Sequence, residues 1–139
     1  MILLDTGPLV ALFDKDDDFH SICKKELARL RDALMTTWPV LTEVTYLLNF
    51  SSAALDLCFE FLEAGAVSVD SAETGRLSRI HELMKQYRDL PMDFADASLV
   101  ALSESEGISR VFTLDHRDFR IYRPKHLKSF RLIPERLIR

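Results

Sequence analysis

Short apolar runs alternate with longer amphipathic segments along the chain. Five runs have the length and apolar character of buried strands, at residues 2–4, 35–38, 66–69, 110–114 and 130–133. Five segments show helical periodicity, at residues 19–34, 39–50, 53–64, 72–88 and 91–106. Such short apolar strands do not suit an antiparallel sheet with one wet face. The pattern predicts an α/β three-layer sandwich, in which helices flank a short, mainly parallel sheet of four or five strands.

Composition narrows the class of protein. A chain of 139 residues that is 47% hydrophobic can bury one full core, and it contains no repeat or linker, so we expect a single domain over residues 1–139. The first residues lack the basic start of a signal peptide, and no run approaches the ~18 apolar residues of a membrane span. Cys23 and Cys58 lie in helical segments and suit a reducing compartment. These features predict a cytoplasmic protein with no membrane association.

Charge is distributed unevenly. The net charge is -4, yet residues 110–139 hold nine Lys and Arg against three Asp and Glu. This segment is either a solvated surface or a rim that follows the phosphates of a nucleic acid. The basic residues that follow Asp115, and that are the candidates for contacting a nucleic-acid backbone, are Arg117, Arg120, Arg123, Lys125 and Lys128.

Acidic residues stand where a parallel sheet places its ligand. Asp5, Asp70 and Asp115 directly follow predicted strands, and ligands of open α/β sheets bind beyond the carboxyl ends of the strands. Two of them also have a structural interpretation. Asp5 can cap a helix that begins at Thr6-Gly7-Pro8, and Asp70 can open the next helix.

Two further acids lie on apolar helical stripes. Glu43 falls in register with Val40, Leu47 and Phe50. Asp96 points between Leu99 and Val100, and Asp93 lies one turn earlier on nearly the same face, where it can also interact with the positive end of the helix dipole. A buried carboxylate without a partner is destabilising by several kcal/mol, as an order of magnitude. Glu43 and Asp96 therefore require a cation.

A metal ion is the simplest cation for these acids, because Lys and Arg are concentrated elsewhere in the chain. Carboxylate oxygens without a cysteine or histidine pair favour Mg²⁺ or Mn²⁺ over Zn²⁺. The histidines show no metal-ligand spacing, at His20, His81, His116 and His126.

Four segments together resemble a known family. They are I-L-L-D-T-G-P-L-V-A-L, T-E-V-T-Y-L-L, P-M-D-F-A-D-A-S-L-V-A-L and V-F-T-L-D-H-R-D-F, in this order along nearly the whole chain. The chain resembles a PIN-domain ribonuclease, of the branch that includes the VapC-type toxins of bacterial toxin–antitoxin pairs.

The resemblance implies a Mg²⁺- or Mn²⁺-dependent endoribonuclease, in which metal-assisted water attacks an RNA phosphodiester. It places the catalytic and metal-binding acids at Asp5, Glu43, Asp96 and Asp115. Additional acids of the family correspond to Asp93 and Asp118, and phosphate or ligand contacts are expected from Thr6 and Thr113. The implied partners are RNA, a cognate antitoxin protein and a second copy of the chain.

Two alternatives stay open. A phosphoacceptor domain of the response-regulator type is also a small parallel α/β sandwich, and Asp70 occupies the acceptor position, although the first strand lacks an acidic pair and the fifth lacks a terminal lysine. The other alternative is a catalytically silent PIN fold that serves as a binding module.

Overall fold

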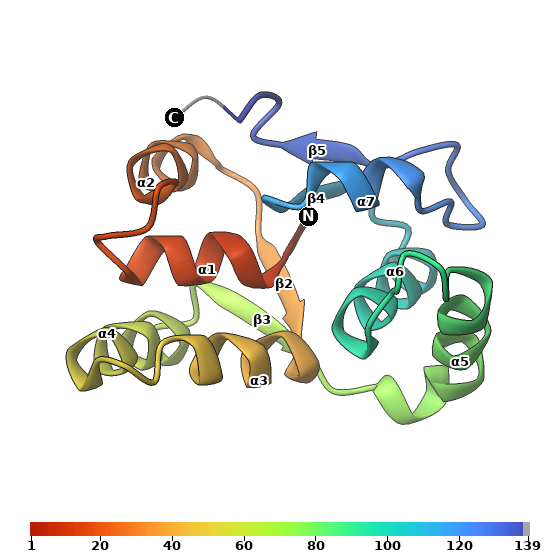
Figure 1. Ribbon diagram of the computed structural model, residues 1–139, viewed down its shortest axis with the longest axis horizontal. Helices are drawn as coiled ribbons and strands as arrows, with labels where there is room; N and C mark the ends of the chain where they lie inside the picture. The colour runs from red at the N-terminus through yellow and green to blue at the C-terminus, as the bar shows by residue number, and fades with distance from the viewer. Residues whose placement is uncertain (138–139) are drawn as a thin grey trace.

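The computed structural model describes residues 1–137, and its centre is a five-stranded sheet (Figure 1). The strand order is β3-β2-β1-β4-β5, and every neighbouring pair is parallel. The strands are β1 (Ile2–Leu4), β2 (Leu34–Thr37), β3 (Val67–Asp70), β4 (Arg110–Phe112) and β5 (Arg131–Ile133). The predicted parallel α/β sandwich is confirmed.

Helices cover both faces of the sheet. On one side α1 packs against its three neighbours, and on the other α5 packs against α6, as Figure 1 shows. The first group comprises α1 (Thr6–Phe13), α2 (His20–Arg29), α3 (Trp38–Leu47) and α4 (Ser52–Glu63). The second comprises the short 3-10 helix η1 (Glu73–Arg76), α5 (Leu77–Gln86) and α6 (Phe94–Glu106). The helix α7 (His116–Ile121) follows β4 directly.

The burial of β1 and α6 in the core explains why these two elements were predicted from the sequence. Ile2, Leu3 and Leu4 have no exposed surface, as expected for a central parallel strand covered on both faces. The helix α6 is buried along most of its length and ends at Gly107, whose φ of 68° is a left-handed conformation that glycine adopts without strain. Among helices in residues 1–137, none is long and apolar enough to cross a bilayer.

Several predicted element bounds were wrong. The segment 19–34 is not one helix, because α2 ends at Arg29 and Leu34 already begins β2. The segment 39–50 ends as a helix at Leu47, so Phe50 lies outside it and is 67% exposed. Residues 72–88 divide into η1 and α5, and α6 begins only at Phe94 because Asp93 is its N-cap.

The hydrophobic periodicity of the sequence did not indicate two of the helices, α1 and α7. The helix α1 is nearly all apolar, so it carries no amphipathic stripe, and Pro8 lies in its first turn, where its missing N–H is harmless. The helix α7 has only six residues, which is too short for a periodic signal.

Candidate active site

Adjacent strand ends bring Asp5 and Asp115 together. Because Leu4 of β1 pairs with Phe112 of β4, the Asp5 N–H donates to the Phe112 carbonyl at 3.0 Å. The Thr113 hydroxyl then donates to Asp5 Oδ2 at 2.7 Å and accepts from the Asp115 N–H at 2.9 Å. Thr113 therefore links the two acids and fixes one oxygen of Asp5.

A second threonine links Asp5 to α3. Asp5 Oδ1 accepts from the Thr6 N–H at 2.8 Å, so Asp5 also caps α1, as the structural reading expected. The Thr6 hydroxyl donates to Glu43 Oε1 at 3.0 Å. The start of α1 therefore lies between Asp5 and the half-buried Glu43.

The first turn of α6 supplies the remaining acids. Asp93 caps the helix by accepting from the Asp96 N–H at 2.8 Å. Asp96 Oδ2 accepts from the Tyr122 hydroxyl at 3.1 Å. Tyr122 is fully buried, and its ring makes edge contacts with Tyr87 and Phe119, each with centroids 5.1 Å apart. Tyr122 was not predicted as part of the site, because nothing in the local sequence indicates a contact across 26 residues.

These acids lie close enough for their charges to affect one another, and we call them the acidic cluster. Its members are Asp5, Glu43, Asp93, Asp96, Asp115 and Asp118. Burial raises the pKa of Asp5 to about 6, with smaller contributions from Asp115 and Glu43, while hydrogen bonds from Thr113 and Thr6 act in the opposite direction. Burial also raises the pKa of Asp96 to about 8, and the charges of Asp5 and Asp93 add to the effect. Raised pKa values are expected where like charges share a partly buried site.

The pKa values of Glu43 and Asp115 are shifted in the same direction. Burial, then the charge of Asp93, raises the pKa of Glu43. Burial raises the pKa of Asp115, and Asp118 both repels it and donates an N–H to its Oδ1 at 3.3 Å. The structure therefore brings all six predicted acids together, although they come from four separate parts of the chain.

Within residues 1–137, no cationic side chain neutralises the acidic cluster directly. Among residues 1–137, none of its members forms an ion pair with Lys, Arg or His, although Arg117 is near enough to lower the pKa of Asp115 slightly. Asp70 differs, because it forms an ion pair with Arg76. Asp70 therefore has a structural partner and stands outside the cluster.

The donor set fits a hard divalent cation. Carboxylate oxygens at the carboxyl ends of parallel strands, uncompensated and partly buried, are the ligands that Mg²⁺ and Mn²⁺ prefer. Within the described residues, no three His, Cys, Asp or Glu side chains already form a coordination site. The metal-binding role of Asp5, Glu43, Asp96 and Asp115 stays a prediction.

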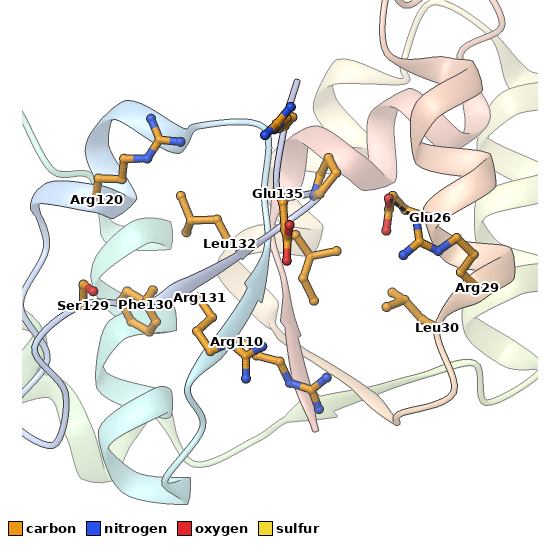
Figure 2. Close-up of a pocket in the computed structure, with 13 residues that line it drawn as sticks. Glu26, Arg29, Leu30, Arg110, Arg120, Ser129, Phe130, Arg131, Leu132 and Glu135 are labelled. Atoms are coloured by element: carbon orange, nitrogen blue, oxygen red, sulfur yellow. Dashed lines mark hydrogen bonds and ion pairs between the residues drawn. The ribbon is translucent and has the colours of Figure 1, made fainter. Parts of the chain in front are cut away.

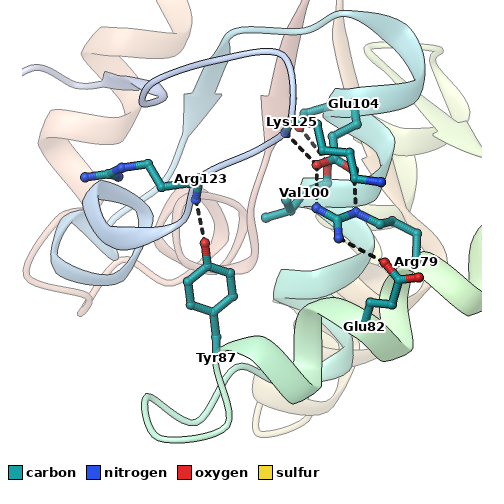
Figure 3. A network of polar contacts seen from close by, with 8 residues as sticks. Arg79, Glu82, Tyr87, Val100, Glu104, Arg123 and Lys125 are labelled. Atoms are coloured by element: carbon teal, nitrogen blue, oxygen red, sulfur yellow. Dashed lines mark hydrogen bonds and ion pairs between the residues drawn. The ribbon is translucent and has the colours of Figure 1, made fainter.

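The predicted basic residues lie on α7 and in the loop after it, and all of them are exposed. Figure 3 shows that this loop is attached to the helices beneath it. The Arg123 N–H donates to the Tyr87 hydroxyl at 2.8 Å, and the Lys125 N–H donates to Glu104 Oε2 at 2.7 Å. Main-chain contacts thus hold the loop, and the charged ends of Arg117, Arg120 and Lys128 stay in solvent.

Comparison with known proteins defines the class. The family model of the PIN domain matches residues 2–124, so the chain belongs to the PIN domain family. The chain is 27% identical over 136 residues to ribonuclease VapC26 of Mycobacterium tuberculosis, a match that covers 96% of this chain and all of that protein. The crystal structure of Mycobacterium tuberculosis VapC20, a sarcin-ricin loop cleaving toxin, superposes with a TM-score of 0.76 at 24% identity, over 84% of this chain and 92% of that one.

These findings confirm the predicted family and the likeness to VapC proteins. They also exclude one of the two alternatives. Family membership, together with the ion pair that engages Asp70, excludes the response-regulator reading. The other alternative, a catalytically silent PIN fold, belongs to the same family, and an RNA cleavage assay distinguishes it from a nuclease.

Proposed function

We propose that this protein is a metal-dependent endoribonuclease that hydrolyses RNA phosphodiester bonds at the acidic cluster, and that it is the toxin of a toxin–antitoxin pair. The observation that carries the proposal is the convergence of partly buried carboxylates with no ion-pair partner among the described residues. The similarity to the VapC26 ribonuclease and the VapC20 toxin supports it. Cytoplasmic action follows from the same proposal.

Asp5, Glu43, Asp96 and Asp115 are the proposed metal ligands. A Mg²⁺ or Mn²⁺ ion bound there would stabilise negative charge on the phosphodiester and lower the pKa of a nearby water. Asp93 and Asp118 add negative charge at the edge of the cluster. Asp93 also caps α6, whereas α7 is capped by Asp115, which accepts from the Asp118 N–H.

Hydroxyl groups keep the proposed ligands in place. Thr113 directs one oxygen of Asp5, Thr6 directs one oxygen of Glu43, and Tyr122 directs one oxygen of Asp96. Burial raises the pKa of Tyr122 far above its ordinary value, and the neighbouring Asp96 adds to this, so the hydroxyl stays protonated and remains a donor. Glu43 and Asp96 thus each keep a second oxygen for a cation. Both oxygens of Asp5 accept one hydrogen bond, and each retains a further lone pair for a cation.

Exposed arginines beside the cluster suit the substrate. Arg117 and Arg120 lie on the helix that begins directly after Asp115, and Arg123 follows its end. Contacts of this kind to phosphate position RNA without reading its sequence. Replacing Arg120 and Arg123 by Gln should weaken RNA binding and flatten its salt dependence, while the cleavage position stays the same.

The decisive experiment is cleavage of end-labelled structured RNAs with Mn²⁺ and with chelator. Wild-type protein should cut in Mn²⁺ and leave a 5′-phosphate and a 3′-hydroxyl, and Asp96→Asn should not. Asp56→Asn, a change of an exposed carboxylate on α4, is the matched control and should cut normally. Binding of RNA without cleavage by wild-type protein in Mn²⁺ would identify the silent binding module instead.

We propose that two different surfaces bind the two protein partners. Large apolar side chains are exposed on α3, on α4 and between them, at Trp38, Tyr46, Leu47, Phe50, Leu57 and Phe59. We propose that a second copy of the chain covers this surface, because patches of this kind mark interfaces. A cognate antitoxin would present an Arg or Lys to the acidic cluster. A strict monomer by light scattering at high concentration would contradict the dimer.

A further inference from the structure

The edge strand β5 borders a groove of about 800 Å³ that lies apart from the acidic cluster. Figure 2 shows Arg120 and Leu132 on one side of the strand, and Glu26 and Arg29 of α2, with Leu30 directly after this helix, across from it. A volume of this size falls within the ~300 to 1,000 Å³ of ordinary ligand sites. The family model ends at residue 124, before β5 begins.

The edge of β5 presents unpaired backbone groups to the groove. The Arg131 N–H donates to the Ser109 carbonyl, and the Ile133 carbonyl accepts from the Thr113 N–H, so these two residues face β4. In a parallel ladder, alternate residues direct their polar groups to opposite sides. The N–H and carbonyl of Leu132 therefore point outward, and β5 has no neighbour on that side.

The groove carries uncompensated positive charge. Arg131 of β5 pairs in register with Arg110 of β4, which places two like charges on adjacent strands. Asp32 forms an ion pair with Arg110. The guanidinium groups of Arg120, Arg131 and Arg136 also line the groove, and none of them forms an ion pair or donates a hydrogen bond within the described part of the chain.

We propose that this groove binds an extended, acidic peptide segment of another protein, which adds a strand to the open edge of β5 and places its carboxylates on Arg131 and Arg136. The main-chain groups of the segment pair with Leu132, as in other cases of strand addition. Its apolar side chains contact Leu30 and Leu132, and its acids complete the pairing that Arg131 lacks.

The same observations disfavour other occupants. A second copy that paired through its own β5 would bring two Arg131 side chains together, and like charges on adjacent strands are unfavourable. RNA phosphates supply acceptors alone, and the 2′-hydroxyl and base donors of RNA do not alternate with acceptors at the spacing of a strand edge. A peptide backbone supplies both.

The test uses the full-length protein and labelled peptides in which Glu alternates with Val, Leu or Phe, with Lys-containing peptides of the same pattern as controls. We expect saturable binding of at least one Glu peptide and none of the Lys peptides. Replacing Arg131 and Arg136 by Gln should weaken binding about tenfold. Replacing Lys85 and Arg88 by Gln removes the same charge from exposed positions near the end of α5 and should leave binding unchanged.

Amide exchange locates the peptide. In the free protein the Leu132 amide should exchange quickly, and saturating peptide should slow it about tenfold or more. Leu132→Pro removes this outward donor, leaves the ladder to β4 intact and should abolish binding. If that variant does not fold, exchange at Leu132 in the wild-type protein decides alone.

Several results would overturn the proposal. They are failure of every Glu peptide to bind at about 1 mM, equal binding of the Lys peptides, and an unchanged Leu132 amide at saturation. Slowed exchange at Leu132 caused by an RNA oligonucleotide, or by raising the concentration of the protein alone, would assign the groove to RNA or to a second copy. Asp96→Asn should bind the peptide normally, which separates this result from the proposed nuclease activity.

Discussion

Two acids on the same helix have opposite surroundings. Glu104 receives two hydrogen bonds from the Arg79 guanidinium, each at 2.8 Å, and one from the Lys125 N–H (Figure 3). Asp96 lies two turns earlier on α6, where its carboxylate accepts from a tyrosine hydroxyl and its N–H donates to the N-cap residue. Its carboxylate is repelled by three acidic neighbours. One carboxylate has its cation built into the fold, and the other has none.

The pKa values express this difference. Burial raises the pKa of Glu104, but the hydrogen bonds from Arg79 and Lys125 outweigh it, so the pKa lies below its ordinary value. Burial raises the pKa of Asp96 to about 8, and its neighbours add to the shift. Burial alone therefore does not distinguish a structural acid from a functional one, whereas the presence of a partner cation does.

The largest expected effect tests the acid without a cation. Asp96→Asn keeps the shape of the side chain and removes one repelling charge, so RNA cleavage should fall about 1,000-fold or more because a proposed metal ligand is lost. The Tm in metal-free buffer should be equal to or higher than that of the wild type. The measurement pairs thermal melts, with and without Mn²⁺, with cleavage of a labelled RNA.

The opposite result for Asp96→Asn would be informative. A variant that melts much lower without metal and still cleaves RNA would show that Asp96 supports the fold and takes no part in catalysis. The exposed Asp56→Asn change controls for loss of a carboxylate and should alter neither quantity.

The acid with a built-in cation should behave in reverse. Glu104→Gln keeps an acceptor for the Lys125 N–H but removes the bidentate charge partner of the Arg79 guanidinium, which retains only its longer contact with Glu82 at 3.3 Å. We expect the free energy of unfolding to fall by about 2 kcal/mol, or the Tm by about 4 to 8 °C, with little change in cleavage rate per folded molecule. A loss below about 0.5 kcal/mol would class the pair as a weak surface contact.

The pH dependence of stability should separate the two environments. In the folded chain Asp5 has a pKa of about 6 and Asp96 of about 8, both above the ordinary 3.8, so between these values the folded state binds more protons than the unfolded state. Without metal, the free energy of unfolding should therefore fall as the pH rises from about 4 to about 8. Melts across this range would show it, and Asp96→Asn should flatten the upper part. A rise in stability over the same range would contradict the assignment.

The parallel sheet and the grouping of the acids could both be predicted from the sequence, for the same physical reason. Parallel strands such as Ile2–Leu4 are buried on both faces and read as apolar runs, and the acids that follow them meet because carboxyl ends share one edge of the sheet. The helix α7 was missed because it is too short to show a period. The helix α1 is apolar on all sides, so only the capping turn at Asp5 indicated it, and periodicity did not.

Partners across the fold were beyond the sequence. Arg79 and Glu104 are 25 residues apart, and Tyr122 and Asp96 are 26 apart, so both contacts depend on how α5, α6 and the chain after α7 pack. The local pattern around Glu104 and Asp96 shows two acids on one helix. Only the tertiary structure shows that one of them has an arginine and the other a tyrosine.

The smallest expected effect concerns that tyrosine. Tyr122→Phe removes the hydroxyl that donates to Asp96 and keeps the ring contacts with Tyr87 and Phe119. If Tyr122 orients the proposed ligand, Mn²⁺ binding and cleavage should each weaken about tenfold, because one hydrogen bond to a charged group is worth about 1.5 kcal/mol. The Tm without metal should change little, since the lost bond joins Tyr122 to a repelled acid. Calorimetry with Mn²⁺ alone measures the binding without RNA. Unchanged Mn²⁺ affinity with a lower Tm would show instead that the hydroxyl stabilises the fold. Asp96 would then resemble Glu104, because each would have a partner that contributes to stability.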